Sequence, residues 1–404
     1  MTSAPASDPA RKRWIILAVI VLAQTVANIG PLGIPAIASL IRADLGLTLT
    51  QAGSFLSAYY IGPIALSLFA GVLADRWGTA KTLVLGQVII AIGLLAVSGA
   101  TSYALLISLM ALAGAGYGTL NPASTTAAMS WFPPRQRATV VGLKQVGLPF
   151  GGMLGAAILP ALALSFGWRT AIVTSAVAVA VCAGLSAAVY RDPPGEPLPA
   201  RKPGERGAIA LVLSNRDLWL VAVATLVFAA MQTVWMAFLA LYLQAVVGLS
   251  LLAASRYLAV AQGGGALGRI VFGLLSDRVF GGRRRLPLAI AGCGSALCSI
   301  ALALTGPGTG ATWLLPLAAV FGFVGIGWNG VQHTLMAELA GPRTAGTAVG
   351  LGLAISSAGV MLGPPVFGWC VTTAGGFRGP WLGLAGVMLG GLGLLALARE
   401  RPRL

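Results

Sequence analysis

The chain has 404 residues, of which 57% are hydrophobic and only 9% are charged, and its mean hydropathy is +0.88. So few charged side chains cannot cover the surface of a water-soluble protein of this length, so the composition predicts a polytopic membrane protein. The net charge of +16 fits the Lys and Arg enrichment of cytoplasmic loops, and no nucleic-acid partner is predicted. All four cysteines lie in apolar segments, so neither a disulfide framework nor a metal site is predicted, and no cofactor is expected.

The membrane-spanning segments can be read in chain order. A hydrocarbon core of about 30 Å needs about 20 apolar residues per helix. The segments that meet this length are 14–40, 51–74, 81–100, 103–131, 138–166, 169–190, 218–246, 252–276, 286–305, 311–339, 344–372 and 378–398. The apolar stretch after the N-terminal "RKRW" is too long for a signal peptide core, so it counts as the first span. These twelve spans predict an all-α membrane protein.

The stretch 191–217 divides the spans six and six. It begins "RDPPGEPLPARKPGERG", which combines Pro, Gly and both charge signs and therefore predicts a cytoplasmic linker. The predicted units are a bundle at 1–190 and a second bundle at 218–404. Nearly all Lys and Arg outside the spans lie in the termini and in the loops that follow even-numbered spans. The positive-inside rule then places both termini in the cytoplasm, and we expect the bacterial cytoplasmic (inner) membrane.

The two halves repeat one another. "GVLADRWGTAK" after the second span matches "GLLSDRVFGGRRR" after the eighth. The fifth span, "ATVVGLKQVGLPFGGMLG", aligns without gaps on "GTAVGLGLAISSAGVMLG" in the eleventh. Duplication of a six-span unit is typical of secondary transporters.

These motifs resemble the major facilitator superfamily, whose signature after the second span is Gly-x-Leu-Ala-Asp-Arg-x-Gly-Arg-Lys. The matching residues are Gly71, Leu73, Ala74, Asp75, Arg76, Gly78 and Lys81, and a second copy carries Gly273, Asp277 and Arg278. The chain departs from the signature at Thr79 and Ala80. The resemblance implies twelve helices in two pseudo-symmetric six-helix bundles that transport by alternating access.

The resemblance also gives the motif residues a gating role. It implies that contacts of Asp75 and Asp277 hold the halves together when the cytoplasmic side is closed; the alternative is that they are charges that only fix topology. In the fifth span, Gly147, Gly151 and Gly155 form a ridge of small residues for close helix packing.

Polar side chains recur at helical spacing inside the spans. The pairs are Gln24 and Asn28, Tyr117 and Asn121, Asn329 and His333, and, seven residues apart, Gln262 and Arg269. The resemblance implies that their helices surround a central path. The aromatic side chains Trp235 and Trp328 are further candidates, with packing as the alternative.

Two cations lie inside predicted spans, and no predicted span has a carboxylate at its centre. Arg269 is eight residues before Asp277, about 12 Å from the cytoplasmic end at ~1.5 Å per residue. Lys144 lies at a similar depth in the other half. Charges at this depth usually face a polar cavity, so an anionic substrate is predicted to neutralise them. The alternatives are that Lys144 snorkels to the surface, that Arg269 braces Asp277, and that His333 is a hydrogen-bonded core residue.

A narrower resemblance concerns the substrate. Monocarboxylate and oxalate/formate carriers have a substrate-binding arginine near the position of Arg269, and the Lys-Gln-x-Gly-x-Pro pattern at Lys144 resembles cyanate-type carriers. Monocarboxylate carriers have an aspartate where this chain has Gly265. Oxalate/formate carriers have a lysine in the eleventh span, where this chain has Ser356 and Ser357. The predicted function is transport of a small organic anion, either by proton-linked symport or by anion exchange.

The sequence leaves two alternatives to transport of an anion. The nearest alternative is an exporter of amphipathic or drug-like compounds, which normally needs an acid within the membrane. A membrane sensor is a second alternative, and no enzymatic activity is predicted. The expected partners are the lipid bilayer, a small anionic substrate and protons as a candidate coupling ion, and the expected state is a monomer.

Overall fold

The computed structural model describes residues 9–133, 136–192, 206–341 and 344–400. Inside these ranges it does not describe the side chains at 9–10, 67–76, 137–139, 206–209 and 346. Within the described part every regular element is a helix.

The first half of the chain forms α1 (Pro9–Gly33), α2 (Ala38–Leu45), α3 (Leu49–Gly53), α4 (Phe55–Trp77), α5 (Thr79–Ser98), α6 (Tyr103–Trp131), α7 (Arg137–Phe166) and α8 (Trp168–Val189). The second half forms α9 (Arg206–Ser214), α10 (Arg216–Tyr242), α11 (Leu251–Leu274), α12 (Arg285–Ala303), α13 (Ala311–Phe321), α14 (Asn329–Ala340), α15 (Ala345–Thr373) and α16 (Arg378–Leu397). Eleven helical stretches of the described part are long and apolar enough to cross a membrane. The remaining predicted span corresponds to α4, so the predicted fold class is confirmed.

Two predicted spans are interrupted. In the first span a 3₁₀ turn at Ile34–Ile37 separates α1 from α2, because Pro35 lacks the N–H that an α-helix needs there. In the tenth span a π-helical turn at Gly322–Ile326 separates α13 from α14, where the glycines of "FGFVGIG" weaken the regular helix.

The segment predicted as a linker, 191–217, contains helix α9. Its sequence "RGAIALVLS" has an apolar run, and Val212 is buried. The apolar run forms a helix inside the segment that the prolines and glycines upstream predicted to be a linker, and only Val212 of the run is buried among its described side chains.

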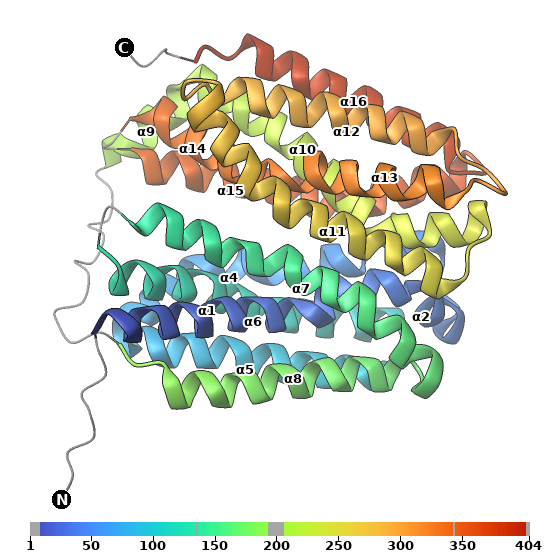
Figure 1. The fold of residues 1–404 in the computed structure, drawn as a ribbon, viewed down its shortest axis with the longest axis horizontal. Coiled ribbons are helices and arrows are strands. Elements are labelled where there is room, and N and C mark those ends of the chain that lie inside the picture. Colours follow the sequence, from blue (N-terminus) through green and yellow to red (C-terminus); the bar gives the residue numbers. More distant parts are fainter. Residues whose placement is uncertain (1–8, 134–135, 193–205, 342–343, 401–404) are drawn as a thin grey trace, which may run out of the picture.

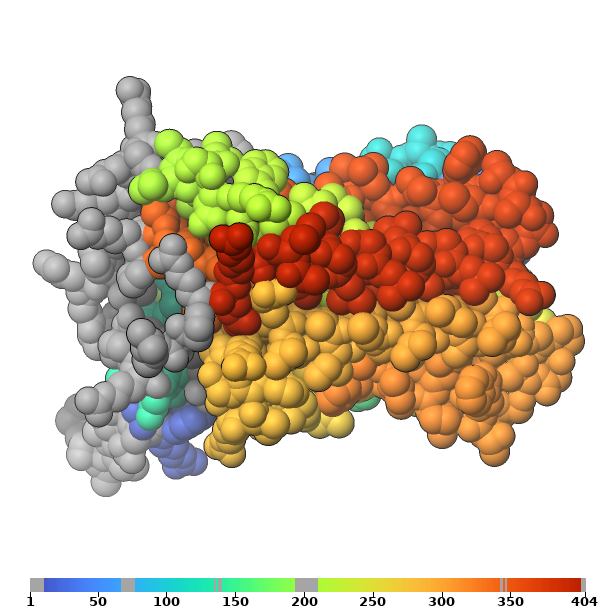
Figure 2. Space-filling view, turned by 90° about the horizontal axis from the view of Figure 1, so that it is seen from above, coloured from blue at the N-terminus to red at the C-terminus, as the bar shows by residue number. Residues whose placement is uncertain are grey.

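The helices form two groups that lie side by side (Figure 1). Helices α1 to α8 make up one half of the molecule and α9 to α16 the other. Helix α1 begins and α16 ends at the same end of the bundle, which we call the termini end, and the opposite end is the far end. Seen from the side of the second half, α16 runs along the surface with α12 beside it (Figure 2).

Close helix packing is repeated in the two halves. A Cβ atom added to Gly151 in α7 would lie 2.3 Å from the Thr25 backbone oxygen in α1. Its aligned partner in the repeat, Gly359 in α15, would lie 2.1 Å from the Leu226 backbone oxygen in α10. Gly155 is equally confined against α1, so the predicted glycine ridge is confirmed as a packing surface.

Hydrogen bonds join the halves at the far end. The Ser39 hydroxyl donates to the Gln244 side-chain oxygen at 2.9 Å, and the Ser255 hydroxyl donates to the Ala36 backbone oxygen at 3.1 Å. Gly53 in α3 also packs tightly on the Phe238 ring of α10. Between residues that the structure describes, the inter-half hydrogen bond closest to the termini end is made by Arg269.

Candidate functional site

Lys144 is fully buried between α7 and α6. Its ammonium group donates to the backbone oxygen of Asn121 at 3.0 Å, to the side-chain oxygen of the same residue, and to the Thr125 hydroxyl at 2.9 Å. The side chain is 0% exposed. The three hydrogens are therefore satisfied by neutral acceptors inside the first half, a geometry that does not fit the snorkelling alternative.

Arg269 makes a different kind of contact, because it reaches out of its own half. Its Nη1 donates to the backbone oxygen of Gln145 in α7 at 2.9 Å. Its Nε is buried and has no hydrogen-bond partner in the part of the chain that the structure describes. The edge of the guanidinium formed by Nε and Nη2 is the one that pairs with a carboxylate in a two-bond fork.

The alternative that Arg269 braces Asp277 does not fit either. Asp277 pairs with Arg284, whose side chain is 9% exposed and whose Nη2 lies 3.2 Å from a Glu338 carboxylate oxygen. Among the side chains that the structure describes, every ion pair lies near an end of the bundle, and neither Lys144 nor Arg269 takes part in one. Both charges at mid-span are left without a carboxylate.

Aromatic and polar groups from three further helices lie within electrostatic range of Arg269. Its charge acts electrostatically on the side chains of Tyr60 in α4, Tyr117 in α6 and His333 in α14. His333 is half-buried. Residues from both halves therefore meet at the guanidinium, although the sequence spacing alone did not bring Tyr60 into the group.

The polar pair predicted in α1 forms hydrogen bonds within the first half. The Gln24 amide donates to the Tyr117 hydroxyl at 2.8 Å, and the Asn28 amide donates to the Gln24 backbone oxygen at 2.6 Å. The Asn28 side-chain oxygen is buried and has no partner among the described residues. This network fixes Tyr117 on the face that also carries Asn121 and Thr125.

Gln262 lies at the contact between α11 and α7. It is 0% exposed, and a Cβ atom added to Gly152 would lie 2.7 Å from its amide nitrogen. Neither its amide nitrogen nor its amide oxygen has a partner among the described residues. A buried amide with both ends unpaired is costly, so this side chain holds unused hydrogen-bonding capacity.

Three of the predicted site residues lie in the second half and make their contacts within that half. The Asn329 amide donates to the Gln232 side-chain oxygen at 3.1 Å. The Trp328 indole donates to the Gly325 backbone oxygen at 3.0 Å. The Trp235 ring stacks on Phe321 with centroids 3.7 Å apart, and its indole donates to a serine hydroxyl of α12.

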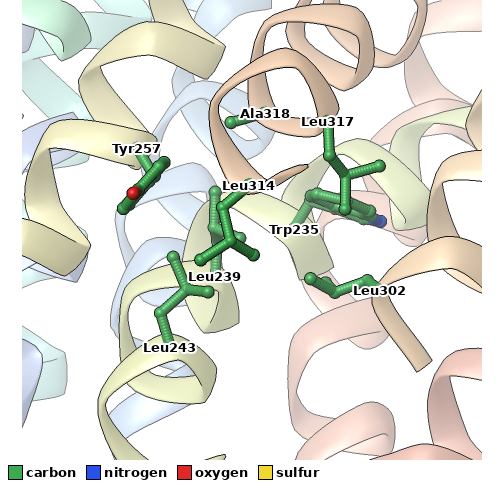
Figure 3. Close-up of a pocket in the computed structure, with 8 residues that line it drawn as sticks. All are labelled: Trp235, Leu239, Leu243, Tyr257, Leu302, Leu314, Leu317 and Ala318. Atoms are coloured by element: carbon green, nitrogen blue, oxygen red, sulfur yellow. The ribbon is translucent and has the colours of Figure 1, made fainter. Parts of the chain in front are cut away.

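Trp235 also lines a small apolar cavity between α10, α11, α12 and α13 (Figure 3). Leu239, Leu243, Leu314 and the ring of Tyr257 form its other walls. Its volume of about 10 Å³ is at the limit for a single water molecule. An organic substrate does not fit in this cavity, so the cavity gives Trp235 no role in binding one.

The predicted gating motif is described only in part. The side chains of Gly71, Asp75 and Arg76 lie outside the described residues. Gly78 has a φ of +87° and directly precedes α5. The Asp192 carboxylate accepts a hydrogen bond of 3.1 Å from the Ala80 N–H and so caps the N-terminus of α5. In the second copy, Arg278 belongs to the short π-helical turn that follows α11, and Gly273 adjoins open space.

Comparison with known proteins decides the family. The model of the Major Facilitator Superfamily matches residues 14–358, which is more than half of the chain. The chain belongs to the Major Facilitator Superfamily. It is therefore an integral membrane protein and a transporter of that superfamily.

Relatives within the superfamily extend over most of the chain. A probable sulfoacetate transporter of Cupriavidus necator is 27% identical, over 98% of this chain and 95% of its own length. The hexuronate transporter of Bacillus subtilis is 25% identical, over 89% of this chain and 87% of its own length. The solved structure of the nucleoside transporter NupG shares the fold with a TM-score of 0.80 and 15% identity, covering 96% of this chain and 100% of NupG.

Several contact residues were not found from the sequence. Thr125 continues the spacing of Tyr117 and Asn121, so extending that stripe by one turn would have found it. Gln145 contributes only a backbone oxygen, for which a sequence gives no signal. Arg284 is one of three consecutive arginines in "GGRRR", and nothing in that run distinguishes it from its neighbours.

Proposed function

We propose that this Major Facilitator Superfamily transporter carries a small organic anion, most simply a carboxylate. The observation that supports the proposal is the state of Arg269. Its guanidinium lies at mid-span between the two halves, its Nε is unpaired, and no carboxylate among the described side chains neutralises it. A substrate carboxylate on the Nε and Nη2 edge supplies both the missing charge and the missing acceptor.

Lys144 has a supporting role in this proposal. Because its three hydrogens are already donated to Asn121 and Thr125, it attracts the anion through its charge without a direct contact. A buried charge acts over several ångströms because the surrounding protein screens it less than water does. The printed names of two relatives, a sulfoacetate and a hexuronate transporter, support an anionic substrate.

The unpaired amides indicate where the rest of the substrate binds. Gln262 lies seven residues before Arg269 on the same face of α11, and the Asn28 oxygen is unpaired on α1. Both side chains are buried, and Gln262 lies where α11 of the second half packs on α7 of the first. Separation of the halves would expose them, and hydroxyl groups of the substrate would then satisfy them.

Transport in this proposal is alternating access between the halves at 1–190 and 218–404. The hydrogen bonds of Ser39 and Ser255 hold the far end closed, so the described state loads or releases substrate at the termini end. By the positive-inside rule we assign that end to the cytoplasm. We also propose that the protein works as a monomer in the cytoplasmic membrane, with Asp75 and Asp277 controlling closure of the termini end.

The test is transport by the purified full-length chain in liposomes. Each vesicle preparation contains one unlabelled candidate, and uptake of the same labelled compound is followed; the panel consists of sulfoacetate, a hexuronate, short monocarboxylates and amphipathic cations. We expect counterflow for at least one carboxylate or sulfonate and none for the cations. Counterflow of the cations with none of the anions would contradict the proposal and favour the exporter alternative.

A further inference from the structure

A groove on the outside of the first half has no role in the proposed transport. It lies between α5 and α8, which run side by side in Figure 1, at the termini end of the bundle. Its volume is about 690 Å³. The buried hydrogen bond from the Gln87 amide to the Ser186 hydroxyl, at 3.0 Å, holds the two helices together beside it.

The groove is apolar along its length and cationic at its mouth. Val84 and Val88 line its apolar part, and the exposed stripe continues along α5 through Ile92 and Leu95, which are 57% and 54% exposed. Side chains this apolar and this exposed on a spanning helix face lipid. The stripe is the right shape and polarity for one acyl chain.

At the mouth, Lys81 and Arg191 are both exposed. The Lys81 ammonium has no hydrogen bond or ion pair with the part of the chain that the structure describes. Arg191 donates through Nη1 to the backbone oxygens of Ala187 and Tyr190, which orients its guanidinium, and its other nitrogens make no hydrogen bond with the described residues. The carboxylate of Asp192 is engaged at the α5 N-terminus by the Ala80 N–H.

Trp77 completes the mouth and is 55% exposed. Tryptophan side chains gather at the level of lipid headgroups, because one edge of the ring is polar and the rest is apolar. A free cation pair, an interfacial tryptophan and an apolar track therefore meet in one groove. Among the described side chains that line the mouth, the two cations Lys81 and Arg191 outnumber the one carboxylate, Asp192.

We propose that this groove binds an anionic phospholipid, with its phosphodiester between Lys81 and Arg191 and one acyl chain along Val84 and Val88. Phosphate oxygens are the natural acceptors for both side chains, and basic clusters at this level of the membrane select anionic headgroups. The inference is independent of the transported substrate. It adds a lipid partner to the loop that carries the Gly78 turn.

The test uses native mass spectrometry of the full-length chain in detergent with added phosphatidylglycerol, phosphatidylcholine or phosphatidylethanolamine. Wild-type protein is expected to retain phosphatidylglycerol at least fivefold better than the other two. Arg191→Gln and Lys81→Gln should each remove most of that preference. Arg283→Gln is the matched control, because it removes an exposed cation of the second half at the same end.

Two further arms separate a lipid from a free phosphate. Val84→Trp fills the apolar track without changing charge, and it should weaken retention of phosphatidylglycerol about as much as Arg191→Gln. Glycerophosphoglycerol, which has the headgroup and no acyl chains, should not compete. Equal retention of all three lipids, unchanged retention in Val84→Trp, better retention of phosphatidylethanolamine, or effective competition by the headgroup alone would each overturn the proposal.

Discussion

Lys144 and Arg269 have the same charge and a similar depth, but their surroundings differ. Lys144 is fully buried and satisfied by two residues of its own half. Arg269 is half-buried, reaches across to the other half and keeps an unpaired Nε. A cation whose hydrogens are all engaged can act on a ligand only through its field, whereas one with a free edge can bind the ligand directly.

The internal repeat sharpens this difference. The position aligned with Lys144 is Gly352 in α15, where an added Cβ atom would lie 2.8 Å from the Gln332 amide nitrogen. That nitrogen is buried and has no partner among the described residues. The second half therefore lacks the cation that the first half holds at the aligned position, and its own cation lies on α11.

The largest effect is expected from Arg269→Lys. Lysine keeps the charge but loses the planar fork, which removes about 2 to 3 kcal/mol of charge-assisted hydrogen bonding. We expect kcat/KM for substrate uptake into liposomes to fall about 30- to 150-fold, since about 1.4 kcal/mol corresponds to a factor of ten. Arg169→Lys is the matched control, because this half-exposed arginine pairs with Asp44 near the far end and should change uptake less than twofold. Normal transport by Arg269→Lys would rule out the two-bond contact.

A smaller effect is expected from Lys144→Met, which keeps the shape of the side chain and removes its charge. A unit charge roughly 12 Å from an anion contributes about 1.4 kcal/mol at an effective dielectric constant of about 20, so the apparent KM should rise about tenfold. The maximal rate should change little. Lys12→Met removes an exposed lysine at the termini end and should leave KM unchanged. A variant at Lys144 with wild-type kinetics would leave this lysine a purely structural role.

Asn121→Asp neutralises the charge of Lys144 while leaving the lysine side chain in place. The new carboxylate would pair with the ammonium at the position of the present side-chain oxygen and cancel its charge. We expect a rise in apparent KM of about fivefold, somewhat less than in Lys144→Met, with the thermal unfolding temperature preserved. Asn121→Ala loses the same acceptor without adding a charge, so it should destabilise the fold more and change KM less. The reverse order would show that the hydrogen bond matters and the field does not.

The sequence predicted the spans well because each needs only length and apolar composition. Helix α6 has the predicted bounds; α7 and α16 differ from theirs by one residue at one end, and α8 and α15 by one residue at each end. The interruptions of the first and tenth spans were missed, because the cost of a proline or of several glycines depends on what packs around them. Helix α9 was missed because its apolar run follows a segment rich in Pro and Gly.

The sequence predicted which residue types form the site, but not which residues contact one another. Spacing placed Tyr117 and Asn121 on one face of their helix, but it could not show that the Lys144 ammonium donates its hydrogen bonds to that face. Trp235 and Trp328 were aromatic candidates with packing as the alternative, and their rings contact other rings of the second half. Contacts between residues far apart in the sequence, such as Arg269 with Gln145, depend on how helices cross, and helical periodicity carries no information about crossing.

The smallest and most specific effect concerns His333, which lies within the electrostatic reach of Arg269 and has no counterpart beside Lys144. The free histidine side chain titrates near neutral pH, and His333 is the one histidine of the chain, so it is our candidate for carrying a coupling proton. An anion held by Arg269 would also attract a proton onto the neighbouring imidazole, because opposite charges stabilise each other. Proton and anion would then bind together, and an inward proton gradient should stimulate uptake severalfold.

His333→Gln keeps a polar side chain of similar size and removes the titrating group. We expect it to lose the stimulation by an imposed pH gradient while exchange at equal pH stays within about twofold of wild type. The measurement is uptake into liposomes with and without the gradient, and with and without internal substrate. Stimulation that persists in the variant removes His333 from the mechanism. If wild type shows no stimulation but is accelerated by internal substrate, the carrier is an anion exchanger, and Arg269 returns loaded because an empty cationic site closes unfavourably.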